Sequence, residues 1–178
     1  MNAEPVCRVL DSLGAPYVLI GGHALAARGY PRFTVDVDLL TTDARVLTPA
    51  AWAGIQQHGA VIDVRRGDAD DPLGGVVQIV LQDGSDVDVI LGKWTWLAQM
   101  IERAEPMSVG GTEIRVPTIG DLILLKLTAG GYIDLQDAAA LLAVADREAV
   151  IREVNAHIED ARPDVRPLWR DLLARTGR

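Results

Sequence analysis

Little cysteine, few aromatic residues and no long hydrophobic run characterise this sequence. Cys7 is the only cysteine among 178 residues, which excludes an intrachain disulfide and a zinc site built on cysteines. No uninterrupted apolar run reaches the roughly 18 residues that are needed to cross a bilayer. Residues 1–5 also lack the basic-then-apolar pattern of a signal peptide. We therefore expect a cytoplasmic protein with no membrane partner.

The chain has an excess of acidic residues and carries a formal net charge of −8. Sequence-independent binding to DNA or RNA depends on neutralising many phosphates, so this charge weighs against a long nucleic-acid ligand. It leaves room for a nucleic-acid end held in a local basic groove. Hydrophobic residues make up 49% of the chain and charged residues 24%, a balance typical of a globular domain. A metal ion and a small anionic ligand fit this composition better than a long polyanion does.

The hydrophobic pattern predicts alternating strands and helices first and helices alone afterwards. Strands are expected at residues 17–20, 33–40, 60–64, 76–81, 85–91 and 112–116. Helices are expected at residues 4–13, 23–28, 94–103, 118–129, 134–145, 147–160 and 165–176, with weaker helical character at 46–58. This order predicts an α/β (α+β) fold with its core in residues 1–117. Residues 118–178 would form a helical C-terminal part packed on that core in a single compact unit.

The strand expected at residues 33–40 has one acidic face, because Asp36 and Asp38 are two positions apart. Two carboxylates placed in this way can share or bridge divalent cations, as in two-metal phosphoryl chemistry. Mg²⁺ prefers oxygen ligands and binds through a few carboxylates together with substrate phosphates, so a third acid from a neighbouring strand would complete the site. Asp88 is our choice for that acid, and Asp86, on the same face, is the alternative.

Gly21 and Gly22 stand where the first expected strand passes into a helix. Without a side chain, their backbone can approach a phosphate closely, and the N–H groups at the start of a helix favour an anion. A Gly-Gly pair is common in ordinary turns, just as an isolated Asp-x-Asp is common on solvated strand faces. The nucleotide and metal interpretation is favoured because the pair comes fourteen residues before the aspartates.

Two segments together carry a resemblance to a known superfamily. Residues 20–24, Ile-Gly-Gly-His-Ala, followed by residues 32–38, Arg-Phe-Thr-Val-Asp-Val-Asp, resemble the polymerase-β-type nucleotidyltransferases. The AbiEii-like, minimal nucleotidyltransferase branch is the most similar, since residues 117–126 and 134–137 resemble it as well. The likeness covers roughly residues 15–145.

This resemblance implies a fold, a reaction and a set of partners. The fold would be a mixed β-sheet of nucleotidyltransferase type flanked by helices, with a C-terminal helical extension. The reaction would move a nucleoside monophosphate from a nucleoside triphosphate to an acceptor, with Mg²⁺ or Mn²⁺ bound. The acceptor could be an RNA 3′ end, a protein or a small molecule. Some AbiEii-like proteins are toxins of toxin–antitoxin pairs, which makes an antitoxin a candidate partner.

The resemblance also implies roles for individual residues. Asp36 and Asp38 would bind the metals, and Asp88 would join them and help to deprotonate the acceptor. Lys126 would lie near the triphosphate, and Asp137 would support that lysine or the nucleotide.

Three more residues near the motif are candidates for the nucleotide side. His23 could contact a phosphate from the first helical turn, although a histidine there is as often a capping or packing residue. Arg32 could meet a phosphate or the acceptor, and its alternative is an ordinary exposed arginine. Thr34 shares the acidic face and could support the metal ligands.

Other classes of function stay open at this point. Gly22 stands where many members of the superfamily have serine, so a non-catalytic nucleotide- or partner-binding protein of the same fold is conceivable. A phosphate-ester hydrolase would use the same acids but lacks a histidine cluster, since His58 and His157 are far from the motif. The scattered tryptophans are expected to pack in the interior rather than to stack on bases: Trp52, Trp94, Trp96 and Trp169.

Overall fold

Five strands form the main sheet of the structure, a computed structural model that describes residues 2–68 and 73–177. Across the sheet they run in the order β1 (Tyr17–Ile20), β2 (Val37–Thr41), β5 (Asp86–Gly92), β4 (Leu73–Val80) and β3 (Val61–Arg66). β2 and β5 are parallel, whereas all other neighbours are antiparallel. The sheet is therefore mixed, which confirms the predicted fold class. A separate hairpin pairs β6 (Glu105–Val109) with β7 (Thr112–Val116).

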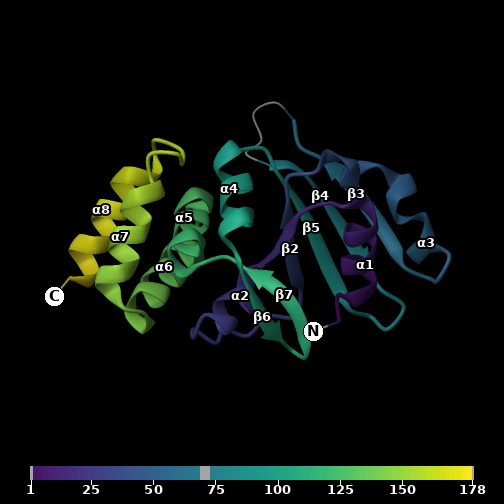
Figure 1. Ribbon diagram of the computed structural model, residues 1–178, viewed down its shortest axis with the longest axis horizontal. Coiled ribbons are helices and arrows are strands. Elements are labelled where there is room, and N and C mark those ends of the chain that lie inside the picture. Colours follow the sequence, from purple (N-terminus) through teal and green to yellow (C-terminus); the bar gives the residue numbers. More distant parts are fainter. Residues whose placement is uncertain (1, 69–72, 178) are drawn as a thin grey trace.

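Helices lie on both sides of this sheet (Figure 1). On one side are α1 (Glu4–Leu13) and a series of short turns: η1 (Ala44–Leu47), η2 (Pro49–Trp52) and α3 (Ala53–Gln56). On the other side are α2 (Gly21–Ala27), α4 (Thr95–Arg103) and α5 (Ile119–Ala129). The weak helical character expected at residues 46–58 takes the form of these separate short turns, because Pro49 lacks an N–H group and begins a new turn there.

The chain ends in a group of helices that pack around α5. These are α6 (Tyr132–Val144), α7 (Arg147–His157) and α8 (Val165–Thr176). The Thr118 side chain caps α5 by accepting a hydrogen bond from the Asp121 backbone N–H, as its sequence position predicted. The Asp121 carboxylate is fully buried and accepts a hydrogen bond from Arg103 of α4 at 2.7 Å, which ties α5 to α4.

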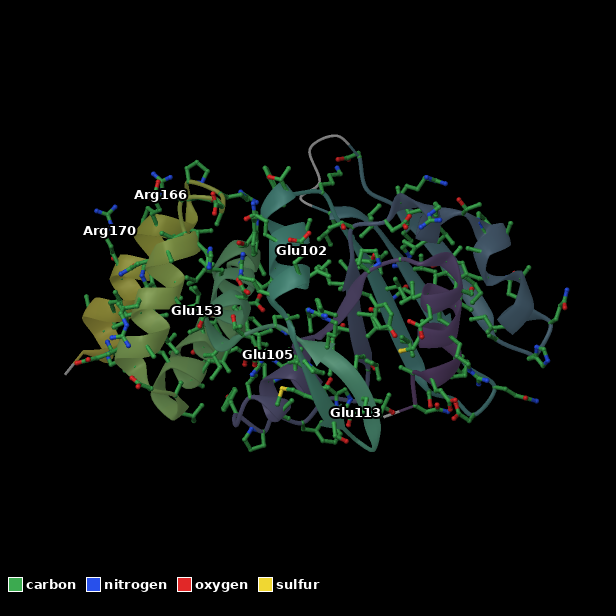
Figure 2. All side chains as sticks on the ribbon, viewed as in Figure 1. Glu102, Glu105, Glu113, Glu153, Arg166 and Arg170 are labelled. Carbon is green, nitrogen blue, oxygen red and sulfur yellow. The ribbon has the colours of Figure 1, made fainter. Side chains whose placement is uncertain are left out.

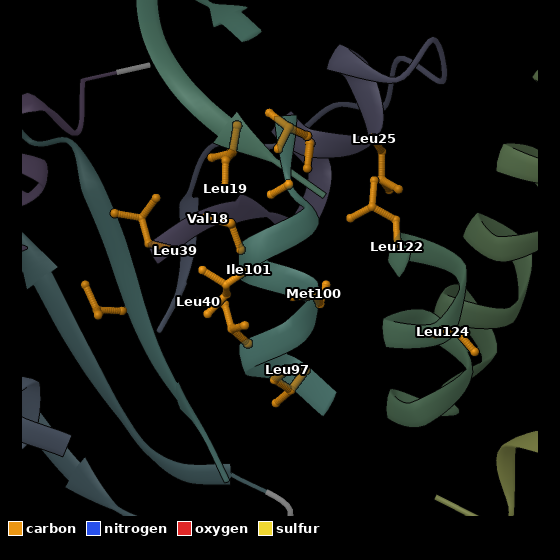
Figure 3. Packing of buried hydrophobic residues seen from close by; sticks show 14 of the residues in the cluster. Val18, Leu19, Leu25, Leu39, Leu40, Leu97, Met100, Ile101, Leu122 and Leu124 are labelled. Atoms are coloured by element: carbon orange, nitrogen blue, oxygen red, sulfur yellow. The ribbon is translucent and has the colours of Figure 1, made fainter. Parts of the chain in front are cut away.

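Apolar side chains join the sheet to the C-terminal helices through α4 (Figure 3). Leu97 and Ile101 of α4 lie close to Leu40 of β2, and Leu25 of α2 faces Leu122 of α5. All five are at least 95% buried. Each leucine so buried contributes about 1.5–3 kcal/mol to folding. The core thus runs from the sheet into the helical part, while a domain boundary at residue 117 stays a prediction.

Two charged contacts reinforce this packing at its edges. Glu153 of α7 accepts a hydrogen bond from the Gly120 backbone N–H at 3.3 Å, and Glu105 of β6 forms an ion pair with Arg28 of α2 at 2.7 Å. Both glutamates are labelled in Figure 2. Within the described part of the chain, no helix is long and apolar enough to cross a membrane.

The acidic strand is shorter than the sequence suggested. β2 begins at Val37 rather than at residue 33, and Phe33 and Val35 are 89% and 69% exposed. The cause is the length of β1: its last residue, Ile20, pairs with Asp38, and the chain then turns away into α2. Residues before Val37 have no β1 partner, so Val35 does not share the buried face of Val37 as expected.

Candidate active site

Asp38 and Asp88 are direct neighbours on parallel strands. The register of β2 and β5 pairs Asp38 with Asp88, and it pairs Val37 with Val87 one position earlier. Side chains alternate along a strand, so both valines are buried on one face and both aspartates project from the other. The pairing of two strands that are far apart in sequence thus brings two of the three proposed acids together.

The surroundings of Asp38 make its negative charge unfavourable. Burial, followed by the charges of Asp88 and Asp36, raises the pKa of Asp38 to about 6. Lys126 and Arg32 act in the opposite direction but do not offset this rise. Carboxylates that are buried together and repel each other are stabilised by a cation, so this corner of the sheet favours a positive ligand.

Asp88 has similar surroundings. Burial raises its pKa above the usual aspartate value, and the charge of Asp86 adds to that rise. Hydrogen bonding from Gln78 on β4 lowers the pKa of Asp88 and is the chief opposing influence. Its Oδ1 atom is buried and has no hydrogen-bond partner among the described residues. A buried carboxylate oxygen without a donor is costly, so this atom is available to a ligand.

The Gly21-Gly22 turn lies directly against these acids. Gly21 has a φ of +64°, and a Cβ added to it would lie 1.8 Å from Asp38 Oδ2. Only glycine combines this backbone conformation with so close an approach. A Cβ added to Gly22 would lie 2.7 Å from the Cβ of Thr34. Thr34 therefore occupies the space that a side chain at position 22 would need, which gives a structural reason for Gly22 in place of serine.

Charged side chains from α5, α6 and the loop before β2 form a second part of the site. Lys126 Nζ lies 2.8 Å from Asp134 Oδ1 and 2.9 Å from Asp137 Oδ2. Arg32 Nη1 lies 2.9 Å from the same Asp137 oxygen, so the buried Asp137 carboxylate links Arg32 to Lys126. Lys126 and Asp38 line the same pocket, and both cations lower the pKa of Asp38, so this cluster lies near the acids.

Asp134 is a residue whose place in this cluster the sequence did not reveal. A helix was expected to begin at residue 134, but α6 begins at Tyr132 after Gly131, so Asp134 lies in the first turn and accepts a hydrogen bond from Lys126. The resemblance over residues 134–137 was the available signal. The contact between Asp134 and Lys126 was not predicted because the lysine belongs to a different helix, α5.

Two other candidates hold less central positions. Asp36 is exposed and stands just before β2, where its charge still acts on both Asp38 and Asp88. His23 lies in the first turn of α2, and burial lowers its pKa. Its Nε2 atom is buried without a hydrogen-bond partner among the described residues. A neutral His23 can donate or accept a hydrogen bond at this atom, depending on its tautomer.

Across residues 2–68 and 73–177, no group of three or more His, Cys, Asp and Glu side chains is arranged to hold a metal ion. The site nonetheless fits a hard divalent cation in its chemistry. Two adjacent carboxylates with raised pKa values and the unpartnered Oδ1 of Asp88 are the oxygen donors that Mg²⁺ or Mn²⁺ prefers. Asp38 and Asp88 present these oxygens side by side, whereas the exposed Asp36 acts on them through its charge.

Comparisons with known proteins agree with this geometry at the level of fold. No protein-family model and no curated protein matches the chain. The solution structure of the antibiotic-resistance factor ANT(2″)-Ia matches with a TM-score of 0.57 and 15% identity over 88% of this chain and 89% of that one. The chain has the nucleotidyltransferase fold.

Two further structures show the same likeness. The crystal structure of ANT(2″)-Ia in complex with adenylyl-2″-tobramycin has a TM-score of 0.56 and 17% identity, covering 88% of this chain and 94% of that one. An antigenic nucleotidyltransferase-like protein from Paracoccidioides brasiliensis has a TM-score of 0.51 and 17% identity, covering 93% of this chain and 89% of that one. Identities this low show the fold, and the AbiEii-like branch stays a prediction.

Proposed function

We propose that this protein is a metal-dependent nucleotidyltransferase that moves a nucleoside monophosphate from a nucleoside triphosphate to an acceptor. The main support is the pairing of Asp38 with Asp88 on parallel strands, directly against the Gly21 turn. The same fold in ANT(2″)-Ia adds to it. Asp36, Asp38 and Asp88 would hold Mg²⁺ or Mn²⁺. The bound ion would neutralise phosphate charge that the protein alone does not balance.

Asp88 is suited to receive a proton from the acceptor. Its Oδ1 atom has no hydrogen-bond partner among the described residues, and general-base catalysis needs such an acceptor within reach of the hydroxyl that loses its proton. The acceptor oxygen would form a bond to the α-phosphorus while the bond from that phosphorus to the bridging oxygen breaks. Pyrophosphate would leave, and the proton of the acceptor hydroxyl would pass to Asp88.

Residues around the acids would hold and orient the triphosphate. Gly21 has no side chain where its backbone meets Asp38, and Lys126 provides a positive charge beside Asp38. Asp137 fixes Lys126 and Arg32 through the same carboxylate oxygen, so it positions both cations. Charges that are already oriented lower the activation barrier of the transfer step because they need no rearrangement during the reaction.

A small molecule with a hydroxyl group is the acceptor class that we favour. The net charge of −8 disfavours a long RNA, and ANT(2″)-Ia has been crystallised with an adenylylated small molecule, adenylyl-2″-tobramycin. An RNA 3′ end and a protein hydroxyl are the alternatives. From the AbiEii-like resemblance we further propose that the protein acts as a toxin and that an antitoxin protein binds it.

Transfer of label from a nucleotide tests this proposal. Purified protein would be incubated with Mg²⁺, each α-³²P-labelled nucleoside triphosphate in turn, and a cell extract later separated into RNA, protein and metabolites. We expect label in one fraction with the wild type and in none with Asp36→Ala/Asp38→Ala. With a heat-inactivated extract, the γ-³²P label should appear only in released pyrophosphate and on no acceptor, because pyrophosphate is the leaving group. Transfer of the γ label, or equal labelling by the double variant, would refute the proposal.

A further inference from the structure

A pocket of about 340 Å³ opens beside Asp38, between the sheet and the helices α4 and α5. Its walls are mostly apolar, with Leu40 and Ile90 from the sheet and Leu97 and Leu125 from the helices. Figure 3 shows Leu40 and Leu97 next to each other on this side of the sheet. Protein sites for small molecules are commonly apolar pockets of about 300–1,000 Å³ with a few polar groups at their edge. The pocket therefore has the size and lining of a ligand site.

The polar edge of the pocket belongs to the triphosphate side of the active site. Of the described residues, Asp38, Gly21 and Lys126 line the pocket, whereas Asp36 and Asp88 do not. Gly21 and Lys126 are the groups that would hold phosphates, and Asp88 is the group that would face the acceptor. A molecule in the pocket would thus extend from the triphosphate rather than from the acceptor.

Two tryptophans give this pocket an aromatic wall. Trp94 lines it and is 41% exposed, and the guanidinium of Arg162 lies over its ring at 5.9 Å from the centroid. Trp96 lines the same pocket, and its buried indole Nε1 has no hydrogen-bond partner among the described residues. A nucleobase offers both a π face for stacking and ring nitrogens or carbonyl oxygens that accept hydrogen bonds.

We propose that this pocket receives the base of the nucleoside triphosphate, with Trp94 as its stacking wall and Trp96 as a hydrogen-bond donor. The inference rests on the proposed function, since it takes the phosphate groups to lie at Gly21 and Lys126. It also revises the expectation that these tryptophans serve packing alone. The chain folds so that the loop after β5 and the start of α4 present both rings beside the active site.

Calorimetric binding to the full chain with Mg²⁺ separates base contacts from phosphate contacts. The probes are α,β-methylene analogues of the four nucleoside triphosphates and inorganic tripolyphosphate, which lacks a base. Trp94→Ala should raise the dissociation constant of the preferred nucleotide about tenfold and leave that of tripolyphosphate unchanged. Trp94→Phe keeps a stacking face and should retain most of the affinity. Trp96→Phe removes the N–H together with part of the ring, and it should change the ratio of affinities among the four bases while tripolyphosphate binds as before.

A second variant acts by filling the pocket rather than by emptying it. Ala129 lines the pocket from the exposed end of α5, so Ala129→Phe adds bulk there without disturbing the core. It should weaken nucleotide binding and spare tripolyphosphate binding. The inference fails if the wild type binds nucleotide while Trp94→Ala and Ala129→Phe bind it equally well. It also fails if these variants raise only the KM for the acceptor. If the wild type showed no Mg²⁺-dependent nucleotide binding at all, that result would instead contradict the proposed function.

Discussion

Replacing Asp88 by alanine should lower the rate of nucleotidyl transfer by at least about a thousandfold. Asp88 is the acid that pairs with Asp38 across β2 and β5, and its Oδ1 atom has no partner within the described structure. The variant would lose a ligand for the divalent ion and the acceptor of the transferred proton at once. The single-turnover rate of label transfer measures this effect.

Asp86 provides a matched control for Asp88, because it projects from the same strand and face two positions earlier. We expect Asp86→Ala to change the transfer rate less than tenfold. The Asp86 carboxylate influences Asp88 through its charge, but it is Asp88 and not Asp86 that pairs with Asp38. If Asp86→Ala abolished transfer and Asp88→Ala did not, the metal site would survive but the assignment of its third acid would be wrong.

The variant Asp38→Asn should be more stable than the wild type at pH 8 in metal-free buffer. Burial and the charges of Asp88 and Asp36 raise the pKa of Asp38 from 3.8 to about 6, so its ionised form is less favourable in the folded chain than in the unfolded one. This cost is absent below pH 4, grows as the pH rises, and is fully present above about pH 6. Asparagine removes the charge and with it the cost.

The expected gain is about 1–2 kcal/mol once solvent screening is allowed for, or about 2–8 °C in the midpoint of thermal unfolding. Circular dichroism at 222 nm, recorded in EDTA at pH 8 and at pH 4, measures it. The gain should largely vanish at pH 4, where Asp38 is protonated in the wild type as well. A variant less stable than the wild type at pH 8 would show that the carboxylate has stabilising partners that the structure does not reveal.

Local sequence signals predicted the residues at the centre of the candidate site. The Gly21-Gly22 turn is predictable because a short apolar strand ends just before it, and the alternation of valine and aspartate predicts the common face of Asp86 and Asp88. The start of β2 was not predictable in the same way. It depends on where β1 ends, and pairing partners 18 to 24 residues apart are not visible in a local pattern.

The parts of the site that depend on tertiary packing were harder to predict. Asp137 lies 105 residues after Arg32, and only the packing of α6 near the loop before β2 brings their charges together. Trp94 and Trp96 look like ordinary core residues in sequence because their neighbours in space come from β2 and α5. Family resemblance supplied Lys126 and Asp137, whereas composition and periodicity gave no reason to choose them.

Mg²⁺-dependent binding of a non-hydrolysable nucleoside triphosphate tests the central claim most directly. The titration would compare the wild type with Asp36→Ala/Asp38→Ala, and with Asp63→Asn, which alters an exposed acid of β3 in the same sheet. We predict binding by the wild type and Asp63→Asn that is lost in EDTA, and no metal response in the double variant. Equal binding in EDTA, or an equal metal response in the double variant, would contradict a metal-dependent site at these aspartates.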